Sequence, residues 1–252
     1  MGEEAPAKNG AARILDAAVR ILDAAVRLFG RSGIASTSLK SIAVEAGVSQ
    51  ALIIHHFGTK NGLRRACDAH VNRLIRERKE AAIDEGPQLD PLFGLRLMAD
   101  GRDLMRYLVR TLTEGGDGVD EFIDDMVADA EVYMAHGVEV GTFRPSAVPR
   151  ERVVMLTLWS LGALVLHEHL DRLLGVDLLA EDYGPAGLAP YIRPALELFA
   201  DGLLADGAYE ELTRAFVDAA PAGPAAPVGP AGPGPADTAP ADTADIRPDQ
   251  KD

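Results

Sequence analysis

The sequence predicts an all-α protein, and three observations support that fold class. The chain has 252 residues, of which 47% are hydrophobic, so it can bury the core of one or two domains. Before residue 219, apolar residues recur at spacings of three and four, the period of a helix, and scarcely alternate as strands require. Glycine and proline separate these stretches at points that suit helix ends and helix starts.

One long helix and two short helices begin the chain, and longer ones follow. Gly33 and Gly47 can take the left-handed conformation that ends a helix, and Ser49 and Thr59 can cap new ones. Pro91, Pro149 and Pro190 suit first turns. We predict helices over residues 12–32, 39–46, 49–57, 60–84, 91–99, 102–114, 120–140, 149–175, 190–206 and 208–219.

Both ends of the chain are expected to be disordered. Residues 219–252 hold eight of the sixteen prolines and no aromatic residue, so they cannot bury enough surface to offset the entropy of ordering. Residues 1–11 are short and mostly polar or small, and they lack the apolar core of a signal peptide, so no export is expected. The apolar stretch 153–166 is shorter than the roughly 18–20 residues that cross a bilayer, so we expect no membrane partner.

Charge is distributed unevenly. The formal net charge is −14, which excludes a histone-like protein that coats nucleic acid by bulk attraction. Residues 5–76, however, hold eleven basic and four acidic residues, so this end alone suits a phosphate surface. The single cysteine, Cys67, excludes an internal disulfide and a Cys-rich zinc site, and it fits a reducing cytoplasm.

The first helix contains a duplicated heptad. Residues 13–19 and 20–26 both read RILDAAV, and because seven residues make nearly two turns, the apolar face continues through both copies. A slipped coding repeat explains the duplication without any function. The alternative is that Arg13, Arg20 and Arg27, which form a row along the helix, meet a phosphate backbone.

Residues 38–57, SLKSIAVEAGVSQALIIHHF, have the parts of a helix-turn-helix. Ile42 and Ala43 can face inward, and Ala43 is small enough for a second helix to cross closely. Gly47 permits the sharp turn, Ser49 can cap the second helix, and Ile53 begins that helix's buried face. The opposite face of the second helix would enter a major groove of DNA with its first turn.

The stretch from residue 21 to residue 63 resembles the DNA-binding domain of tetracycline-repressor-type (TetR family) transcription regulators. The matching runs, in order and spacing, are Leu28-Phe29, Gly33, Thr37-Ser38, Ile42-Ala43, Ala46-Gly47-Val48-Ser49, His55-His56-Phe57 and Lys60. The resemblance implies a three-helix, helix-turn-helix DNA-binding head over residues 12–59. It also implies a helical ligand-binding and dimerisation domain over residues 60–218, where the match is one of architecture only. The expected function is a repressor that leaves its operator when a small molecule binds.

The resemblance also assigns DNA contacts. Gln50 matches the base-reading position and could bond to adenine, and Ala51 could press against a thymine methyl group. Leu52 and Ile54 stand where many members have Thr and Tyr, which should shift reading towards thymine methyls and remove phosphate hydrogen bonds. The full predicted contact set, which includes phosphate-contacting positions, is Ser38, Lys40, Ser49, Gln50, Ala51, Leu52, Ile54, His56 and Lys60.

The body is expected to form a homodimer. The helix predicted over 149–175 is apolar nearly all round in its middle, and a dimer covers such a helix better than one small monomer does. The resemblance implies that helices 149–175 and 190–206 pair with their two-fold mates in a four-helix bundle. Two recognition helices would then meet successive major grooves of a near-palindromic operator in double-stranded DNA.

Met and aromatic side chains between residues 102 and 175 could line an adaptable apolar cavity. Most such residues in a helical protein are simply core, and the resemblance adds the expectation that some pocket exists. The effector is expected to be a small apolar or amphipathic molecule. The predicted lining of the pocket is Tyr107, Phe122, Met126, Met155, Trp159 and His167.

No catalytic motif stands out. Ser160 lies mid-helix and lacks the first glycine of a nucleophile elbow. His167 and His169 are two apart, unlike the four-residue spacing of zinc proteases, and the adjacent His55 and His56 point about 100° apart on a helix. We expect no enzyme, no cofactor and no metal. Two alternatives stay open: a nucleoid or scaffold protein that senses nothing, and a transcriptional activator.

Overall fold

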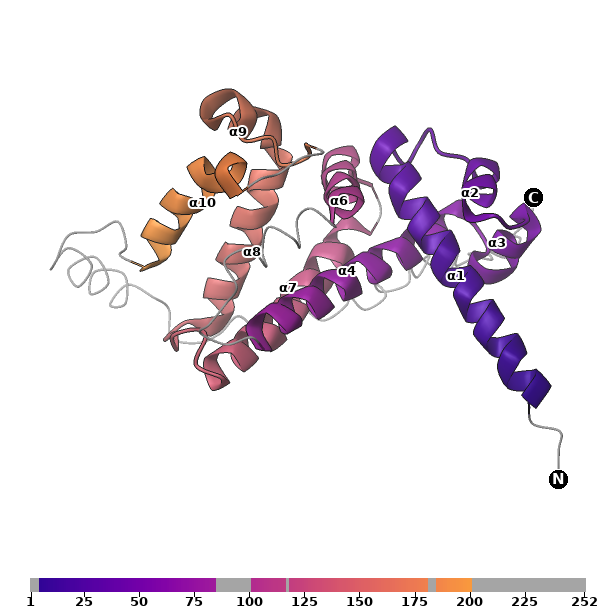
Figure 1. Ribbon diagram of the computed structural model, residues 1–252, viewed down its shortest axis with the longest axis horizontal. Helices are drawn as coiled ribbons and strands as arrows, with labels where there is room; N and C mark the ends of the chain where they lie inside the picture. The colour runs from indigo at the N-terminus through magenta and orange to yellow at the C-terminus, as the bar shows by residue number, and fades with distance from the viewer. Residues whose placement is uncertain (1–4, 85–100, 117, 181–184, 201–252) are drawn as a thin grey trace, which may run out of the picture. The chain divides into compact units, whose positions relative to one another are not determined.

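The computed structural model describes residues 5–84, 101–116, 118–180 and 185–200, all within one compact unit, Met1–Asp201. Every regular element in these ranges is an α-helix (Figure 1), so the predicted fold class is confirmed. The helices are α1 (Ala5–Ser32), α2 (Leu39–Ala46), α3 (Gln50–Phe57), α4 (Lys60–Asp84), α6 (Arg102–Glu114), α7 (Val119–Glu139), α8 (Pro149–Val165), α9 (His167–Leu174) and α10 (Pro185–Ala200).

Local sequence signals set the ends of α2 and α3. The Ser38 hydroxyl accepts the Ser41 N–H at 3.0 Å, and the Ser38 N–H donates to the Ser41 hydroxyl at 3.2 Å, which makes a capping box. α2 ends at Gly47, whose φ of 65° lies in the left-handed region. The Ser49 hydroxyl then accepts the Leu52 N–H at 3.2 Å and caps α3. The predicted roles of Gly47 and Ser49 are confirmed.

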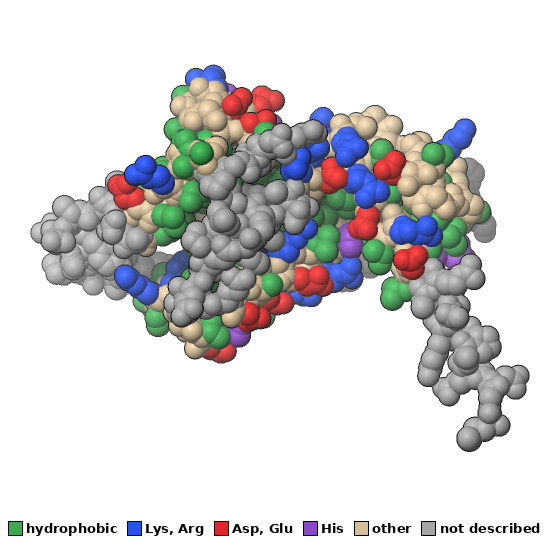
Figure 2. Space-filling model, viewed as in Figure 1, with side chains coloured by type: hydrophobic (Ala, Val, Ile, Leu, Met, Phe, Trp, Pro, Cys, Tyr) green, Lys and Arg blue, Asp and Glu red, His purple; other side chains and the backbone are tan. Residues whose placement is uncertain are grey.

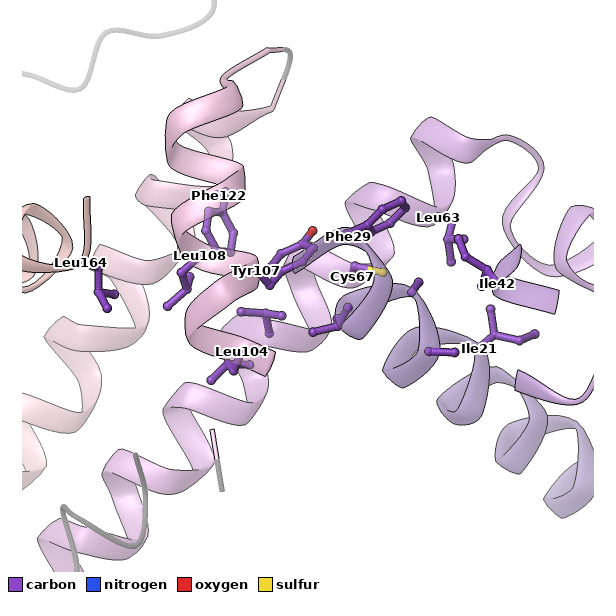
Figure 3. Close-up of a cluster of buried hydrophobic side chains, with 14 of the residues drawn as sticks. Ile21, Phe29, Ile42, Leu63, Cys67, Leu104, Tyr107, Leu108, Phe122 and Leu164 are labelled. Atoms are coloured by element: carbon purple, nitrogen blue, oxygen red, sulfur yellow. The ribbon is translucent and has the colours of Figure 1, made fainter. Parts of the chain in front are cut away.

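One buried hydrophobic cluster runs from the first helices into the later ones (Figure 3). Burying an aliphatic or aromatic side chain of this size contributes about 1.5–3 kcal/mol, so α1 to α4 and α6 to α8 stabilise one another through a shared core. Its labelled members are Ile21, Phe29, Ile42, Leu63, Cys67, Leu104, Tyr107, Leu108, Phe122 and Leu164.

The end of α1 packs directly on α6. A Cβ atom at Gly30 would lie 3.0 Å from the Tyr107 backbone nitrogen and 3.2 Å from the Asp103 carbonyl oxygen, so only glycine allows this approach without a shift. At the other end of α6, a Glu114 carboxylate oxygen accepts the Ile34 N–H at 2.9 Å. The first half of α6 therefore packs on the end of α1, and its last residue is bonded to the loop that follows α1.

The helix predicted over 149–175 is two helices. The chain leaves helical geometry at Leu166, and α8 and α9 are bent by 74° there. Val176 and Leu178, which follow α9, are buried at 0% and 6% exposure. Their burial favours the bent path, and periodicity within the segment gives no sign of it.

The other boundaries differ by smaller amounts. α10 begins at Pro185, where a proline suits the first turn, so Pro190 and Pro194 lie inside the helix and each removes one backbone donor. α1 begins at Ala5, seven residues earlier than predicted. The helices predicted over 91–99 and 208–219, and the tail 219–252, lie outside the described residues.

Candidate nucleic-acid interface

α2 and α3 meet at a tight turn held by backbone hydrogen bonds. The Val48 N–H donates to the Ala43 carbonyl at 2.9 Å, and the Gly47 N–H donates to the Val44 carbonyl at 3.2 Å. Ile53, at 1% exposure, anchors the inner side of α3, which packs on α1, α2 and α4. This packing fixes the orientation of α3 and leaves its other side to solvent.

The outer face of α3 presents both polar and apolar side chains. Gln50 and Ala51 in the first turn are exposed, and Ile54 keeps 47% of its surface exposed. Leu52 and His56 are half-buried at the sides of this face. An amide can bond to an adenine edge, and exposed alkyl groups can contact thymine methyls, so this face has the chemistry to read bases.

Three predicted contact residues already have structural roles. The hydroxyls of Ser38 and Ser49 cap α2 and α3, as described above. The Lys60 ammonium donates to the Ala35 carbonyl at 2.9 Å, which ties the start of α4 to the loop after α1. A lysine ammonium has three donors, so Lys60 retains two with which to meet a phosphate. Lys40 is exposed on α2.

A buried histidine that is not among the predicted site residues links α1 to α4. His70, at 5% exposure, lies 2.9 Å from the Asp23 carboxylate through Nε2 and 2.7 Å from Arg73 through Nδ1. Arginine can only donate, so Nδ1 accepts and the Nε2–H donates to Asp23. The i, i+3 spacing of His70 and Arg73 could have suggested their own contact, but no local pattern indicates the partner on α1, Asp23.

A second buried contact joins α4 to α6. The Tyr107 hydroxyl donates to the Asp68 carboxylate at 2.5 Å, and the Arg64 guanidinium lies 4.0 Å from the same group. Burial raises the pKa of Asp68, while the Tyr107 hydrogen bond and the Arg64 charge oppose the rise. Burial also raises the pKa of the Cys67 thiol well above its ordinary value, so this thiol is neutral and unreactive.

The six predicted pocket residues lie in different surroundings. Tyr107, Phe122 and Met126 are buried, and the first two belong to the core drawn in Figure 3. Met155 and Trp159 on α8 are 68% and 42% exposed. His167 is half-buried at the start of α9, where it borders an open cleft. Of the six, only His167 lines this cleft, whereas Met155 and Trp159, four residues apart, share an exposed face of α8.

The two copies of the duplicated heptad have different environments. Leu15 in the first copy is 67% exposed, whereas Leu22 at the same place in the second copy packs against the core. Asp16 in the first copy pairs with Arg20 at 3.4 Å, whereas Asp23 in the second bonds His70. The second copy therefore belongs to the core, and the first continues α1 beyond it.

Two other kinds of site, a metal centre and a membrane-spanning helix, concern the part of the chain that the structure describes. No group of three or more His, Cys, Asp or Glu residues there could hold a metal ion. No single described helix is long and apolar enough to cross a membrane. The bent pair α8 and α9 passes that test together, by length and composition only.

Comparison with known proteins gives matches to both parts of the chain. Residues 21–67 match the family model for bacterial regulatory proteins of the tetR family, and residues 100–205 match the tetracyclin repressor-like, C-terminal domain. The HTH-type transcriptional regulatory protein RaaS of Mycobacterium tuberculosis (strain ATCC 25618 / H37Rv) is 40% identical over 188 residues, which cover 73% of this chain and 84% of that protein.

Other similarities cover less sequence or show only the fold. The HTH-type transcriptional regulator BetI of Stenotrophomonas maltophilia (strain R551-3) is 37% identical over 73 residues, 27% of this chain and 35% of that protein. A solved structure described as a Clostridium perfringens fatty acid metabolism regulator has a TM-score of 0.50 at 16% identity, covering 74% of this chain and all of the other. At that identity the likeness concerns the fold alone.

A capped helix pair that presents an exposed face, at the basic end of the chain, defines a helix-turn-helix DNA-binding protein. The matches in both parts of the chain identify its kind: the protein belongs to the TetR family of transcriptional regulators. It is therefore a DNA-binding regulator and not an enzyme, and a nucleoid scaffold that senses nothing is not favoured.

Proposed function

We propose that the protein is a repressor that binds a near-palindromic operator as a homodimer and releases it when a small molecule binds to the body. The observation that carries the dimer is an apolar surface on α8 and α10. Met155, Leu158 and Trp159 of α8 are 68%, 49% and 42% exposed, and Leu196 and Phe199 of α10 are 59% and 58% exposed. A contiguous apolar patch of this kind marks an interface more often than a free surface.

The patch joins two helices that already touch. The Trp159 and Phe199 rings lie 5.2 Å apart between their centroids, so α8 and α10 present one surface. A two-fold axis through this surface would pair each helix with its mate and build a four-helix bundle. Two copies of α3 would then be available for successive major grooves, about 34–36 Å apart, which is what a palindromic site requires.

Within each half-site, Gln50 and Ala51 are proposed to read bases and Ile54 to contact thymine methyl groups. Ser38, Lys40, Ser49, Leu52, His56 and Lys60 are the remaining proposed contacts. The effector is proposed to be small and apolar or amphipathic. The chromosome is the target, so the protein would act in the cytoplasm.

The test begins with selection of bound sequences from a random duplex pool by the full-length protein. The selected site should be near-palindromic and bound at least roughly a thousandfold more tightly than random duplex. Light scattering at micromolar concentration should give the mass of two chains. A single-chain mass, or a selected site without two-fold symmetry, contradicts the proposal.

A further inference from the structure

An open cleft of about 630 Å³ lies between the end of α1, α6, the junction of α8 and α9, and the segment after α9. Its walls are the end of α1 (Gly30 and Arg31), one face of α6, the start of α9 after the bend, and Leu179. The volume falls in the range of small-molecule sites, about 300–1,000 Å³. We call it the α1–α6 cleft.

Arginine dominates the polar lining of this cleft. Arg106, Val109, Arg110 and Thr113 recur at helical spacing on one face of α6, and Arg31 adds a third guanidinium from α1. Figure 2 shows Lys and Arg side chains, with Asp and Glu among them, over α6 and the adjoining end of α1. Val109, Val165 and Leu179 supply apolar wall, and His167 and Glu168 complete the lining.

The guanidinium groups already have acceptors within the protein, and Arg106 donates to the Leu179 carbonyl at 3.3 Å. Arg31 and Arg106 both lie near one carboxylate, Asp103, at 3.5 Å and 3.7 Å. Arg110 lies 3.9 Å from Glu114. Glu114 also accepts the Ile34 N–H, so its oxygens serve two donors. A carboxylate or phosphate entering the cleft would bring further acceptor atoms for these arginines, in the paired geometry that guanidinium groups favour.

We propose that the α1–α6 cleft binds a small amphipathic anion, whose carboxylate or phosphate is held by Arg31, Arg106 and Arg110 and whose apolar part lies against Val109, Val165 and Leu179. The Arg31–Asp103 pair joins α1 to α6, and it is half-exposed, so an entering anion can replace Asp103 at little cost. This regulatory step rests on the proposed function: an anion that binds more tightly to the conformation unable to bind the operator would shift the population towards it and so weaken operator binding.

Calorimetry on the full-length protein tests the site with three probes that share one ring system: 2-naphthoate, 2-naphthyl phosphate and uncharged 2-naphthol. The tighter-binding anion should have a Kd below about 1 mM and bind at least tenfold more tightly than naphthol. Whichever anion is tighter identifies carboxylate or phosphate as the natural head group. Equal binding of naphthol, or no binding by either anion at about 5 mM, overturns the proposal.

Single variants locate the site. Arg110→Gln should weaken binding of the tighter-binding anion at least tenfold. Glu168→Gln, which removes the acidic side chain of the lining, should tighten binding of the same anion by a factor of about two to five. Both residues are exposed, so folding should be unaffected. Arg150→Gln is the matched control, because Arg150 is an exposed arginine paired with Glu131 at 2.8 Å and does not line the cleft. Unchanged binding in Arg110→Gln overturns the proposal.

Operator binding is measured separately by fluorescence anisotropy, with and without the tighter anion. The regulatory role is supported if the anion releases the operator from the unaltered protein but not from Arg110→Gln. It is refuted if the operator affinity is unchanged with the anion bound. If the protein bound no operator at all, the proposed function would fail, while the calorimetry would still decide whether the cleft is an anion site.

Discussion

Removing one hydroxyl, by Tyr107→Phe, should destabilise the protein, and the loss should depend on pH. The Tyr107 hydroxyl donates to the buried Asp68 carboxylate at 2.5 Å, and the nearest cation, Arg64, is 4.0 Å away. A hydrogen bond to a charged group contributes about 1.5–3 kcal/mol. For a domain of this size that corresponds to a fall in Tm of very roughly 3–12 °C.

The sign of the pH dependence follows from Asp68. Burial raises its pKa above that of the unfolded chain, so the folded state holds this proton more tightly. The stabilisation that this bound proton contributes is fully present below the pKa of the unfolded chain, about 3.9. It is lost as the pH rises through the higher pKa of Asp68 in the folded state. Without the Tyr107 donor the pKa of Asp68 should rise further, because an opposing contact is gone. The destabilisation should therefore be larger at about pH 8 than at about pH 5.5.

Urea unfolding followed by circular dichroism, at both pH values, measures the loss. Tyr133→Phe is the matched control, since it removes the same atom from a half-buried ring on α7. The reasoning is refuted if Tyr107→Phe costs no more than the control, or if its cost is the same at the two pH values.

Further outcomes are expected for five variants, which test packing, DNA contacts and the dimer interface. Gly30→Ala should lower the free energy of unfolding by about 1–3 kcal/mol, because the new methyl meets the α6 backbone at 3.0 Å. Gly162→Ala, whose methyl would meet nothing within 4 Å, should raise the free energy of unfolding by up to about 1 kcal/mol. If Gly30→Ala and Gly162→Ala have equal effects in chemical unfolding, the packing argument is contradicted. Gln50→Ala should cost about 1–3 kcal/mol on the selected operator and relax one base position. Lys60→Ala should weaken binding to all duplexes alike and lower the slope of log affinity against log salt concentration by about one. A change of base preference in anisotropy titrations of Lys60→Ala would refute the assignment of Lys60 to a phosphate. Leu158→Glu should convert a two-chain mass to a one-chain mass in light scattering with the helical content kept, and an intact dimer would remove α8 from the interface.

The DNA-binding head was predictable because its signals act over short distances. Ser38, Gly47 and Ser49 each set a cap or a turn within a few residues of themselves, so the residue types alone indicate the geometry. The apolar spacing of α1 to α4 likewise identifies the faces that form the core. The contact residues on α3 follow from that geometry and from the resemblance, and they stay a prediction.

The body was less predictable because its outcome depends on distant partners. The break at Leu166 is favoured by burial of Val176 and Leu178, which the local pattern cannot reveal. Trp159 and Phe122 are both aromatic and both lie on helices, yet one is exposed and the other is core. Periodicity indicates which residues share a face of a helix, but it does not indicate which face packs against other helices and which faces solvent.

The shared core sets a limit on dissection of the molecule. A fragment ending at Asp84 would keep α1 to α4 whole, but Phe29, Cys67 and Val71 would lose the cover of α6 and α7 and meet water. Domain swaps between relatives would face the same problem, since a transplanted DNA-binding head brings only part of the hydrophobic core that it shares with the body. Chimaeras that exchange α1 to α4 together with α6 should fold where shorter exchanges fail.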